Sequence, residues 1–167
     1  MKFYVSFFVV VLLSMFSCSY PEGYKPIIEK DRYTIDIAGY LTKTRDLSTT
    51  PSLQYHNRFR TVYLVVTDKI KSSTEENFKQ YHDNLIASFK KQFGEIKVTI
   101  LPDTVLNGHK AIIEEITLKT DGEKVWYYIA TLETDKYYYQ VCSWTIERRK
   151  EKYEADIRHM VNSFKEL

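Results

Sequence analysis

The chain has 167 residues, of which 44% are hydrophobic, 15% aromatic and 28% charged. This composition is globular and excludes an intrinsically disordered chain, while five glycines and four prolines exclude a collagen-like one. A net charge of +2 provides no basic stripe, so no nucleic-acid partner is expected. Two cysteines are too few for a disulfide framework or a cysteine-rich zinc site. The length allows one domain.

The first eighteen residues have the pattern of an export signal. Met1-Lys2 provides a positive start, and residues 3–16 form an apolar run shorter than the roughly 20 residues that span a bilayer. Ser17-Cys18 follows directly, without a small-x-small cleavage site. This pattern resembles a bacterial lipoprotein signal, in the looser form found in Bacteroidota, which implies cleavage before Cys18 and acylation of its thiol. The alternative is an ordinary secretory signal with a coincidental cysteine.

The lipoprotein interpretation predicts three segments: a signal peptide over residues 1–17, a lipidated cysteine and tether over 18–31, and a single domain over 32–167. The bilayer is then a partner through the acyl chains on Cys18, without an integral span. Surface-export signals of Bacteroidota lipoproteins resemble an acidic run directly after the cysteine. The residues after Cys18 lack such a run, so a periplasm-facing position is expected. Cys142 remains as a free thiol, either buried and inert or reactive, and its apolar neighbours favour burial.

In chain order, residues 32–37 alternate as a short strand and residues 41–51 are loop-like. Residues 54–67 are β-branched and aromatic, which predicts a strand, with a possible interruption near His56-Asn57. A helix is predicted over residues 74–93 because apolar residues recur there at spacings of three and four. Its expected signals are capping boxes at Ser72-x-x-Glu75 and Ser73-x-x-Glu76 and a left-handed cap at Gly94.

A strand meander and a second helix are predicted in the remaining chain. Residues 95–101 alternate as a strand, and the dipeptides Asn107-Gly108 and Asp121-Gly122 are typical of hairpin turns. They delimit expected strands over the ranges 109–119, 123–133 and 136–146. A final helix is predicted over residues 148–165, with an inner stripe and an i,i+4 pair between Glu154 and Arg158. The stripe consists of Tyr153, Ile157, Met160, Val161 and Phe164.

The turns predict which side chains share a face of the meander. A two-residue loop at Asp121-Gly122 pairs Ile116 with Tyr127, and one at Thr134-Asp135 pairs Tyr127 with Cys142. One face then holds Ile112, Ile116, Leu118, Val125, Tyr127, Ile129, Cys142 and Trp144, and the other holds Ala111, Ile113, Glu115, Thr117, Trp126, Tyr128, Tyr137, Tyr139 and Val141. Both faces are too apolar to meet bulk water. We therefore expect an α+β fold, an antiparallel meander with helices on both faces (an α/β/α sandwich).

This order of elements resembles the PsbP/Mog-like superfamily, which includes bacterial lipoproteins of the DcrB type. The matching stretches are Tyr63-Leu64-Val65-Val66 before the first helix, Asn107-Gly108-His109-Lys110-Ala111 at the start of the meander, and Tyr139-Gln140-Val141-Cys142-Ser143-Trp144 before the final helix. The resemblance covers about residues 33–164. It implies no catalytic motif and no functional residues, because members of the superfamily resemble adaptors and assembly factors whose partners differ widely.

The sequence contains no nucleotide-binding, zinc-protease, serine-hydrolase or EF-hand motif, so neither a cofactor nor a metal is expected. His82 flanks the apolar stripe of the first helix and is interpreted as a boundary residue rather than a ligand. Glu114 and Glu115 fall on opposite sheet faces, which argues against a paired acid and base. Cys142 and Ser143 lie mid-strand, away from the sharp turns that expose nucleophiles.

Aromatic residues concentrate in the meander. The whole chain contains fourteen tyrosines, which is an unusual number. Aromatic cross-strand pairs stabilise a sheet, which is one explanation. The other is a binding surface, which in the predicted register consists of Glu115, Trp126, Tyr128 and Tyr139.

Three functions remain open from the sequence. The first is a non-enzymatic lipoprotein acting as a binding or assembly module with a protein partner. The second is a small-ligand or lipid-binding domain, which requires an open pocket at Trp126 and Tyr128 rather than a helix over them. The third is an undetected hydrolase, which requires two or more titratable side chains that converge in one cleft.

Overall fold

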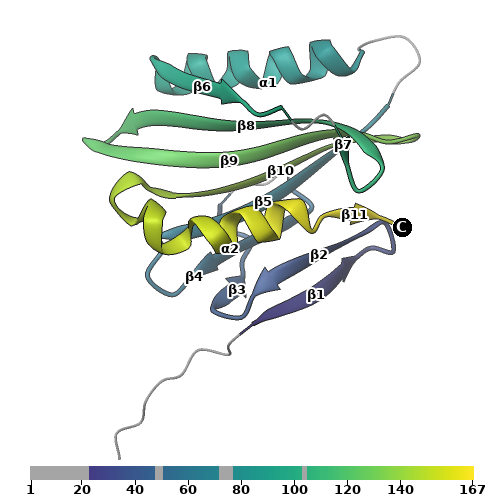
Figure 1. The fold of residues 1–167 in the computed structure, drawn as a ribbon, viewed down its shortest axis with the longest axis horizontal. Helices are drawn as coiled ribbons and strands as arrows, with labels where there is room; N and C mark the ends of the chain where they lie inside the picture. The colour runs from purple at the N-terminus through teal and green to yellow at the C-terminus, as the bar shows by residue number, and fades with distance from the viewer. Residues whose placement is uncertain (1–22, 48–50, 72–76, 103–104) are drawn as a thin grey trace, which may run out of the picture.

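The computed structural model describes residues 23–47, 51–71, 77–102 and 105–167. In this part of the chain, an eight-stranded sheet and a three-stranded sheet pack with two α-helices (Figure 1). Every strand pair is antiparallel. The predicted α+β class is therefore confirmed, while the separate three-stranded sheet was not expected.

The large sheet has the strand order β3-β4-β5-β10-β9-β8-β6, with β7 paired to β8. Its strands are β3 (Leu41–Lys43), β4 (Leu53–Asn57), β5 (Val62–Ile70), β6 (Ile96–Ile100), β7 (Val105–Leu106), β8 (His109–Thr120), β9 (Glu123–Glu133) and β10 (Tyr137–Ile146). The interruption expected near His56-Asn57 is the turn between β4 and β5. The expectation of a loop over residues 41–51 is wrong at its start, because β3 pairs with β4 there.

The small sheet has the order β1-β2-β11 and consists of β1 (Tyr24–Glu29), β2 (Tyr33–Ala38) and β11 (Lys165–Glu166). The boundary of the folded domain at residue 32 is therefore wrong, because β1 lies within the expected tether. Pro26 is compatible with this strand because β1 is at the edge of its sheet, where a missing N–H costs no ladder bond. The expected signal peptide and Cys18 lie outside the described residues.

The hairpin between β8 and β9 has the predicted register, with Ile116 opposite Tyr127. The register predicted for β9 and β10 is wrong by two residues, because Tyr127 pairs with Trp144 and not with Cys142. The cause is a wider loop, in which the backbone N–H and the hydroxyl of Thr134 both donate to the carbonyl oxygen of Tyr137. A shift of two residues keeps every side chain on its predicted face.

Helix α1 (Phe78–Phe93) begins later than predicted. Its capping box is made by Asn77 and Gln80, whose side chains each accept a hydrogen bond from the other residue's backbone N–H. The serine-based capping boxes fall on residues 72–76, outside the described part of the chain. At the other end Gly94 adopts a φ of 76°, which favours glycine, but its ψ of −119° lies outside the left-handed helical region that the sequence predicts.

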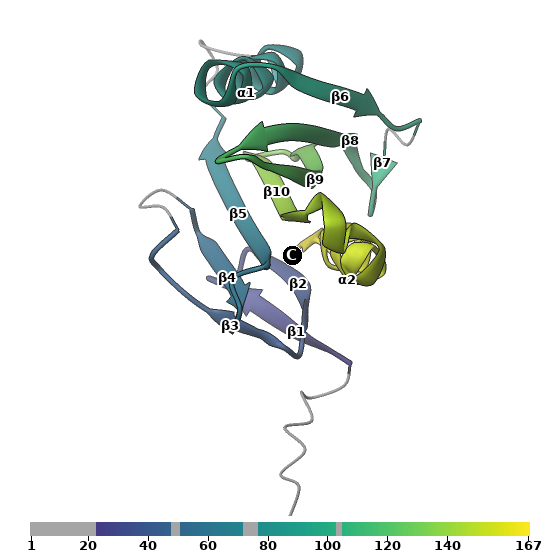
Figure 2. The same cartoon turned by 90° about the vertical axis from the view of Figure 1, so that its left-hand side faces the viewer.

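Helix α2 (Lys150–Asn162) follows a short 3₁₀ turn at Glu147–Arg149. The residues of its predicted inner stripe are buried, and Arg158 donates from Nε to Glu154 Oε1 at 2.9 Å, as expected. The helix is shorter than the predicted range 148–165, so Phe164 packs in the core from beyond its end. The helix lies between the two sheets, and its apolar stripe packs with residues of both (Figure 2). One face of the large sheet is thereby sealed by α2 and β2.

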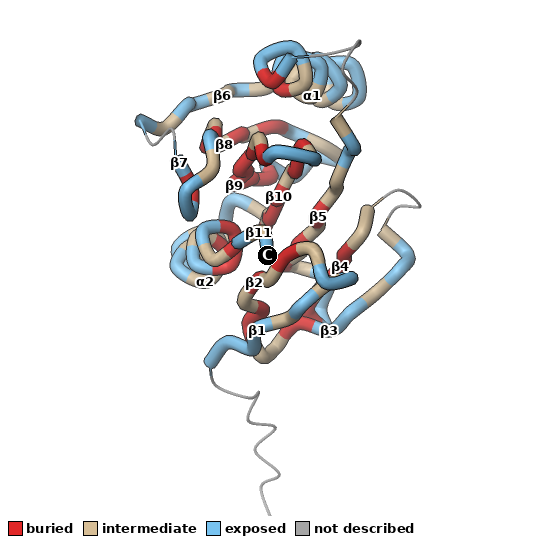
Figure 3. The backbone as a smooth tube through the Cα atoms, turned by 90° about the vertical axis from the view of Figure 1, so that its right-hand side faces the viewer, coloured by how far each residue is buried: buried red, intermediate tan, exposed pale blue. Residues whose placement is uncertain are grey.

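Helix α1 covers the opposite face of the large sheet less completely. Only Phe78 and His82 are buried on it, while the apolar residues Leu85, Ile86 and Phe89 are half-buried against β8, β9 and β10. Coloured by burial, α1 is largely exposed, in contrast to the buried stripe of α2 (Figure 3). Each helix covers one face of the sheet, as predicted, but the two faces are closed to different degrees.

Candidate functional site

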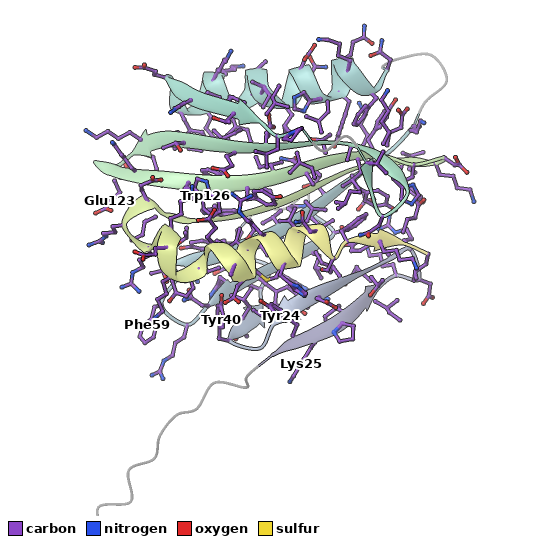
Figure 4. All side chains as sticks on the ribbon, in the orientation of Figure 1. Tyr24, Lys25, Tyr40, Phe59, Glu123 and Trp126 are labelled. Carbon is purple, nitrogen blue, oxygen red and sulfur yellow. The ribbon has the colours of Figure 1, made fainter. Side chains whose placement is uncertain are left out.

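The binding face expected from the sequence is covered by α2. Glu115, Trp126, Tyr128 and Tyr139 do share one face of the sheet, but only 1% of Trp126, 3% of Tyr128 and none of Tyr139 is exposed. Figure 4 shows Trp126 between the sheet and α2. The expectation of an open aromatic surface at these residues is therefore wrong, because α2 packs over them.

These residues instead hold α2 on the sheet. Glu115 accepts hydrogen bonds from Trp126 Nε1 at 2.9 Å, from Lys150 Nζ at 3.2 Å and from the Arg158 guanidinium. Burial alone raises the pKa of Glu115, but these three donors hold that pKa below its ordinary value. The Arg158 guanidinium also lies 4.6 Å from the centre of the Tyr128 ring. The aromatic residues of this face therefore act in packing.

A partly buried aromatic strip lies on the other face, beside α1. Tyr63 on β5 stacks on Trp144 of β10 at 4.9 Å between ring centroids, and Trp144 stacks on Tyr127 of β9 at 5.4 Å. Tyr127 then meets Phe89 of α1 edge to face at 5.4 Å. The pairing of Tyr127 with Trp144 places these rings in one row across the strands. The row is continuous because Tyr63 is also opposite Trp144.

This strip borders a groove of about 320 Å³ between α1 and the strands β5, β9 and β10. We call it the α1-side groove; its lining residues are Leu47, Pro51, Val65, Thr67, Phe89, Gln92, Phe93, Tyr127, Gln140, Cys142 and Trp144. Burial raises the pKa of the Tyr127 hydroxyl and of the Cys142 thiol, so both stay neutral at physiological pH. The described lining of the groove therefore carries aromatic, apolar and amide groups and no charge.

The nucleophile candidates in this region are unreactive. Cys142 is a free thiol that is buried, as its sequence neighbours indicated, and its raised pKa disfavours the thiolate. Ser143 is fully buried on the other face and its hydroxyl donates to the carbonyl oxygen of Tyr63 at 2.7 Å. These residues therefore supply no activated nucleophile to the groove.

A second cleft, of about 410 Å³, lies between α1 and the strands β6 and β8. Glu114 forms its floor; none of this residue is exposed, and neither carboxyl oxygen has a hydrogen-bond partner among the described residues. His82 Nε2 of α1 lies 3.7 Å from Glu114 Oε2, and His82 Nδ1 lies 3.5 Å from the Thr131 hydroxyl. Burial raises the pKa of Glu114 to about 7 and lowers that of His82.

Two titratable side chains thus converge in one cleft, as the hydrolase alternative required. Both are enclosed, however, since Glu114 is fully buried and His82 is 6% exposed, so a bound molecule does not reach them in this structure. The sequence correctly put Glu114 and Glu115 on opposite faces. It missed the burial of Glu114, although the alternation that placed Ile112 and Ile116 on the α1 side places Glu114 there too.

Neither a metal site nor a membrane span is found in the described ranges. No group of three or more His, Cys, Asp or Glu side chains there is arranged to hold a metal ion. Neither of the helices described is long and apolar enough to cross a bilayer.

The Glu114 carboxyl predicts a pH dependence of stability. Because its folded pKa of about 7 exceeds the unfolded value, the folded state retains a proton that the unfolded state releases, and the free energy of unfolding decreases as pH rises towards 7. Chemical denaturation measures the free energy of unfolding at each pH. Between pH 5 and pH 8, this free energy should decrease by about 2–3 kcal/mol less in Glu114→Gln than in the natural protein. Equal losses in both would contradict the buried, unpartnered state of Glu114.

Comparison with known proteins bears on the fold. No protein-family model and no curated protein matches the sequence. The solution structure of cyanobacterial PsbP (CyanoP) from Synechocystis sp. PCC 6803 covers 92% of this chain and 99% of its own, with a TM-score of 0.62 and 12% identity. The match to the crystal structure of LpqN, involved in cell envelope biogenesis of Mycobacterium tuberculosis, covers 87% of this chain and 91% of LpqN, with a TM-score of 0.59 and 8% identity. The chain therefore has a PsbP-like fold, as its order of elements indicated.

Proposed function

We propose that the protein is a membrane-anchored, periplasm-facing lipoprotein that acts as a non-enzymatic binding module, with its ligand site in the α1-side groove. The observation that carries this proposal is the aromatic strip beside α1, which stays partly accessible at the groove on a sheet whose other face is sealed. Aromatic groups that line a concave apolar surface are typical of binding sites.

The chemistry of the groove favours binding over catalysis. General acid and base catalysis needs a titratable group within hydrogen-bond reach of the substrate. The described groove lining has no Asp, Glu, Lys, Arg or His, and its thiol and phenol stay protonated. The pair Glu114 and His82 lies in the other cleft and is enclosed.

The same features indicate the class of ligand. A volume of about 320 Å³ is at the lower end of the range for small-molecule sites, and the rings of Phe89, Tyr127 and Trp144 suit a flat apolar body. Gln92 and Gln140 provide amide groups for one or two hydrogen bonds. No lining charge compensates an ionised group, so we assign an uncharged, partly aromatic small molecule to the groove.

The envelope setting rests on the N-terminal pattern, in which an apolar run ends at Ser17-Cys18. That a protein of the same fold is involved in cell envelope biogenesis of Mycobacterium tuberculosis is in keeping with this setting. An assembly role with a protein partner is the second form of the same proposal, since the strip could receive an apolar side chain of a partner. Mild crosslinking in cells followed by pull-down distinguishes a protein partner from a small ligand.

Mass spectrometry of the native protein tests the anchor. The expected product begins at Cys18 and carries the mass of two or three acyl chains, while Cys18→Ser should leave an unacylated chain that is no longer retained in the membrane fraction. An N-terminus at another position, or a Cys18 without acyl mass, would refute the anchor and leave the groove proposal standing.

Two fluorescent probes test the groove. Phenylnaphthylamine is uncharged, and anilinonaphthalenesulfonate has the same ring system with a sulfonate, so the pair isolates the effect of charge. We expect the uncharged probe to bind more tightly, and Trp144→Ala to weaken it about tenfold or more, because a central aromatic side chain contributes most to such sites. Ile70→Ala, which shortens an exposed apolar side chain outside the groove, is the matched control. Equal binding of both probes, or no effect of Trp144→Ala, would contradict the assignment.

A further inference from the structure

The surface around the start of β1 carries exposed aromatic side chains. Strand β1 starts there at Tyr24, and Figure 4 shows Tyr24, Lys25, Tyr40 and Phe59 along the same lower edge of the molecule. We call this surface the tether end. It consists of Tyr24, Phe59 and a cleft that adjoins Phe59. It is far from α1, which lies at the opposite edge in Figure 1.

Phe59 is the most prominent apolar group of the tether end. It sits in the turn between β4 and β5, and 67% of it is exposed. Arg58 and Arg60 flank it and are also exposed. Arg60 is paired with Asp46, whereas no ion pair is found for Arg58 among the described residues. An exposed ring between cations is typical of residues that enter the interfacial region of a bilayer, where the ring is buried and the cations meet phosphates.

A cleft of about 270 Å³ adjoins Phe59. Its lining residues are Tyr40, Asn57, Phe59, Arg149, Lys152, Tyr153 and Asp156. Arg149 and Lys152 form no ion pair within the described ranges; the Lys152 ammonium lies 5.1 Å from the centre of the Tyr153 ring, a contact that leaves its charge open to an anion. The acidic group of the cleft is Asp156, whose two oxygens already accept hydrogen bonds from the hydroxyls of Tyr24 at 2.6 Å and Tyr40 at 2.8 Å. The cleft therefore presents two cations with a carboxylate that is already satisfied.

The position of the anchor brings this end close to the bilayer. This step rests on the proposed lipidation of Cys18. Cys18 precedes Gly23 by five residues, and a fully extended chain of that length spans at most about 18 Å. The hydroxyl of Tyr24 binds Asp156 in the cleft. An acylated Cys18 therefore holds the cleft, through the start of β1, within a short distance of the lipid headgroups.

We propose that the tether end is a second membrane contact, in which Phe59 enters the interface of an anionic bilayer and Arg58, Arg149 and Lys152 bind the lipid phosphates. The contact orients the domain with α1, which lies at the opposite edge in Figure 1, directed away from the bilayer. A polybasic patch beside an acyl anchor adds affinity and fixes orientation, because each cation near an anionic surface contributes separately.

Vesicle sedimentation tests the contact without the anchor. The protein used is the mature chain from residue 18 with Cys18→Ser, which retains every described element. We expect it to bind vesicles that contain phosphatidylglycerol at low salt, and not vesicles of phosphatidylcholine alone. Phe59→Ser should weaken binding roughly tenfold. Arg149→Gln with Lys152→Gln should weaken it roughly 25-fold, or about fivefold for each charge.

Matched controls lie far from the tether end. Ile70→Ser removes an apolar side chain that is 69% exposed at the end of β5, and Lys90→Gln with Lys91→Gln removes two exposed charges from α1. Both controls should bind like the parent chain. Absence of binding, equal binding to both kinds of vesicle, or equal losses in the control and test variants would overturn the proposal. Binding by the unacylated chain would support it even if Cys18 carried no acyl mass, so the two claims fail separately.

Discussion

The structure depends on an antiparallel meander, β8–β9–β10, that is apolar on both faces. Such a sheet is stable in water only when each face is covered, and the chain supplies one helix for each. Helix α2 and the small sheet close one face so that Trp126 and Tyr139 are almost completely buried. Helix α1 covers the other face only in part. The difference between these two covers determines where the α1-side groove lies.

Two neighbouring glutamates show how strongly the two covers differ. Glu115 faces α2, where three donors satisfy its carboxylate and lower its pKa against the effect of burial. Glu114, one residue earlier, points to the α1 side, where no described donor reaches it and burial raises its pKa. The half-buried, fully hydrogen-bonded charge of Glu115 fixes α2 in one position. An unsatisfied buried charge is costly at neutral pH and makes the α1 side the less stable cover of the sheet.

Local patterns in the sequence predicted most of the architecture. The dipeptide Asp121-Gly122 fixes the register of β8 and β9, and alternation then assigns every meander residue to its face. The shift at Thr134 could not be predicted, because it arises from hydrogen bonds that widen the loop. Strand β1 was missed because Pro26 and its exposed neighbours resemble a linker, and its pairing with β2 is a tertiary contact.

The candidate site was harder to predict than the fold. Strand alternation shows which aromatic residues share a face, but not which face a helix will seal, because both helices have apolar stripes. That choice depends on the docking of α2 against the small sheet, which the sequence did not reveal. Thus the sequence makes Trp126 and Tyr128 candidates for either sheet packing or a binding surface, and the structure shows packing, while Trp144 and Tyr127 on the other face border the groove.

The most direct test of this account compares the two tryptophans of the chain. Acrylamide quenches the fluorescence of a tryptophan that solvent can reach, so Trp126→Phe reports on Trp144 and Trp144→Phe reports on Trp126. The account predicts strong quenching of Trp144 and weak quenching of Trp126 in the folded protein, with the difference abolished in denaturant. Equal accessibility of the two tryptophans in the folded protein, or greater accessibility of Trp126, would contradict it.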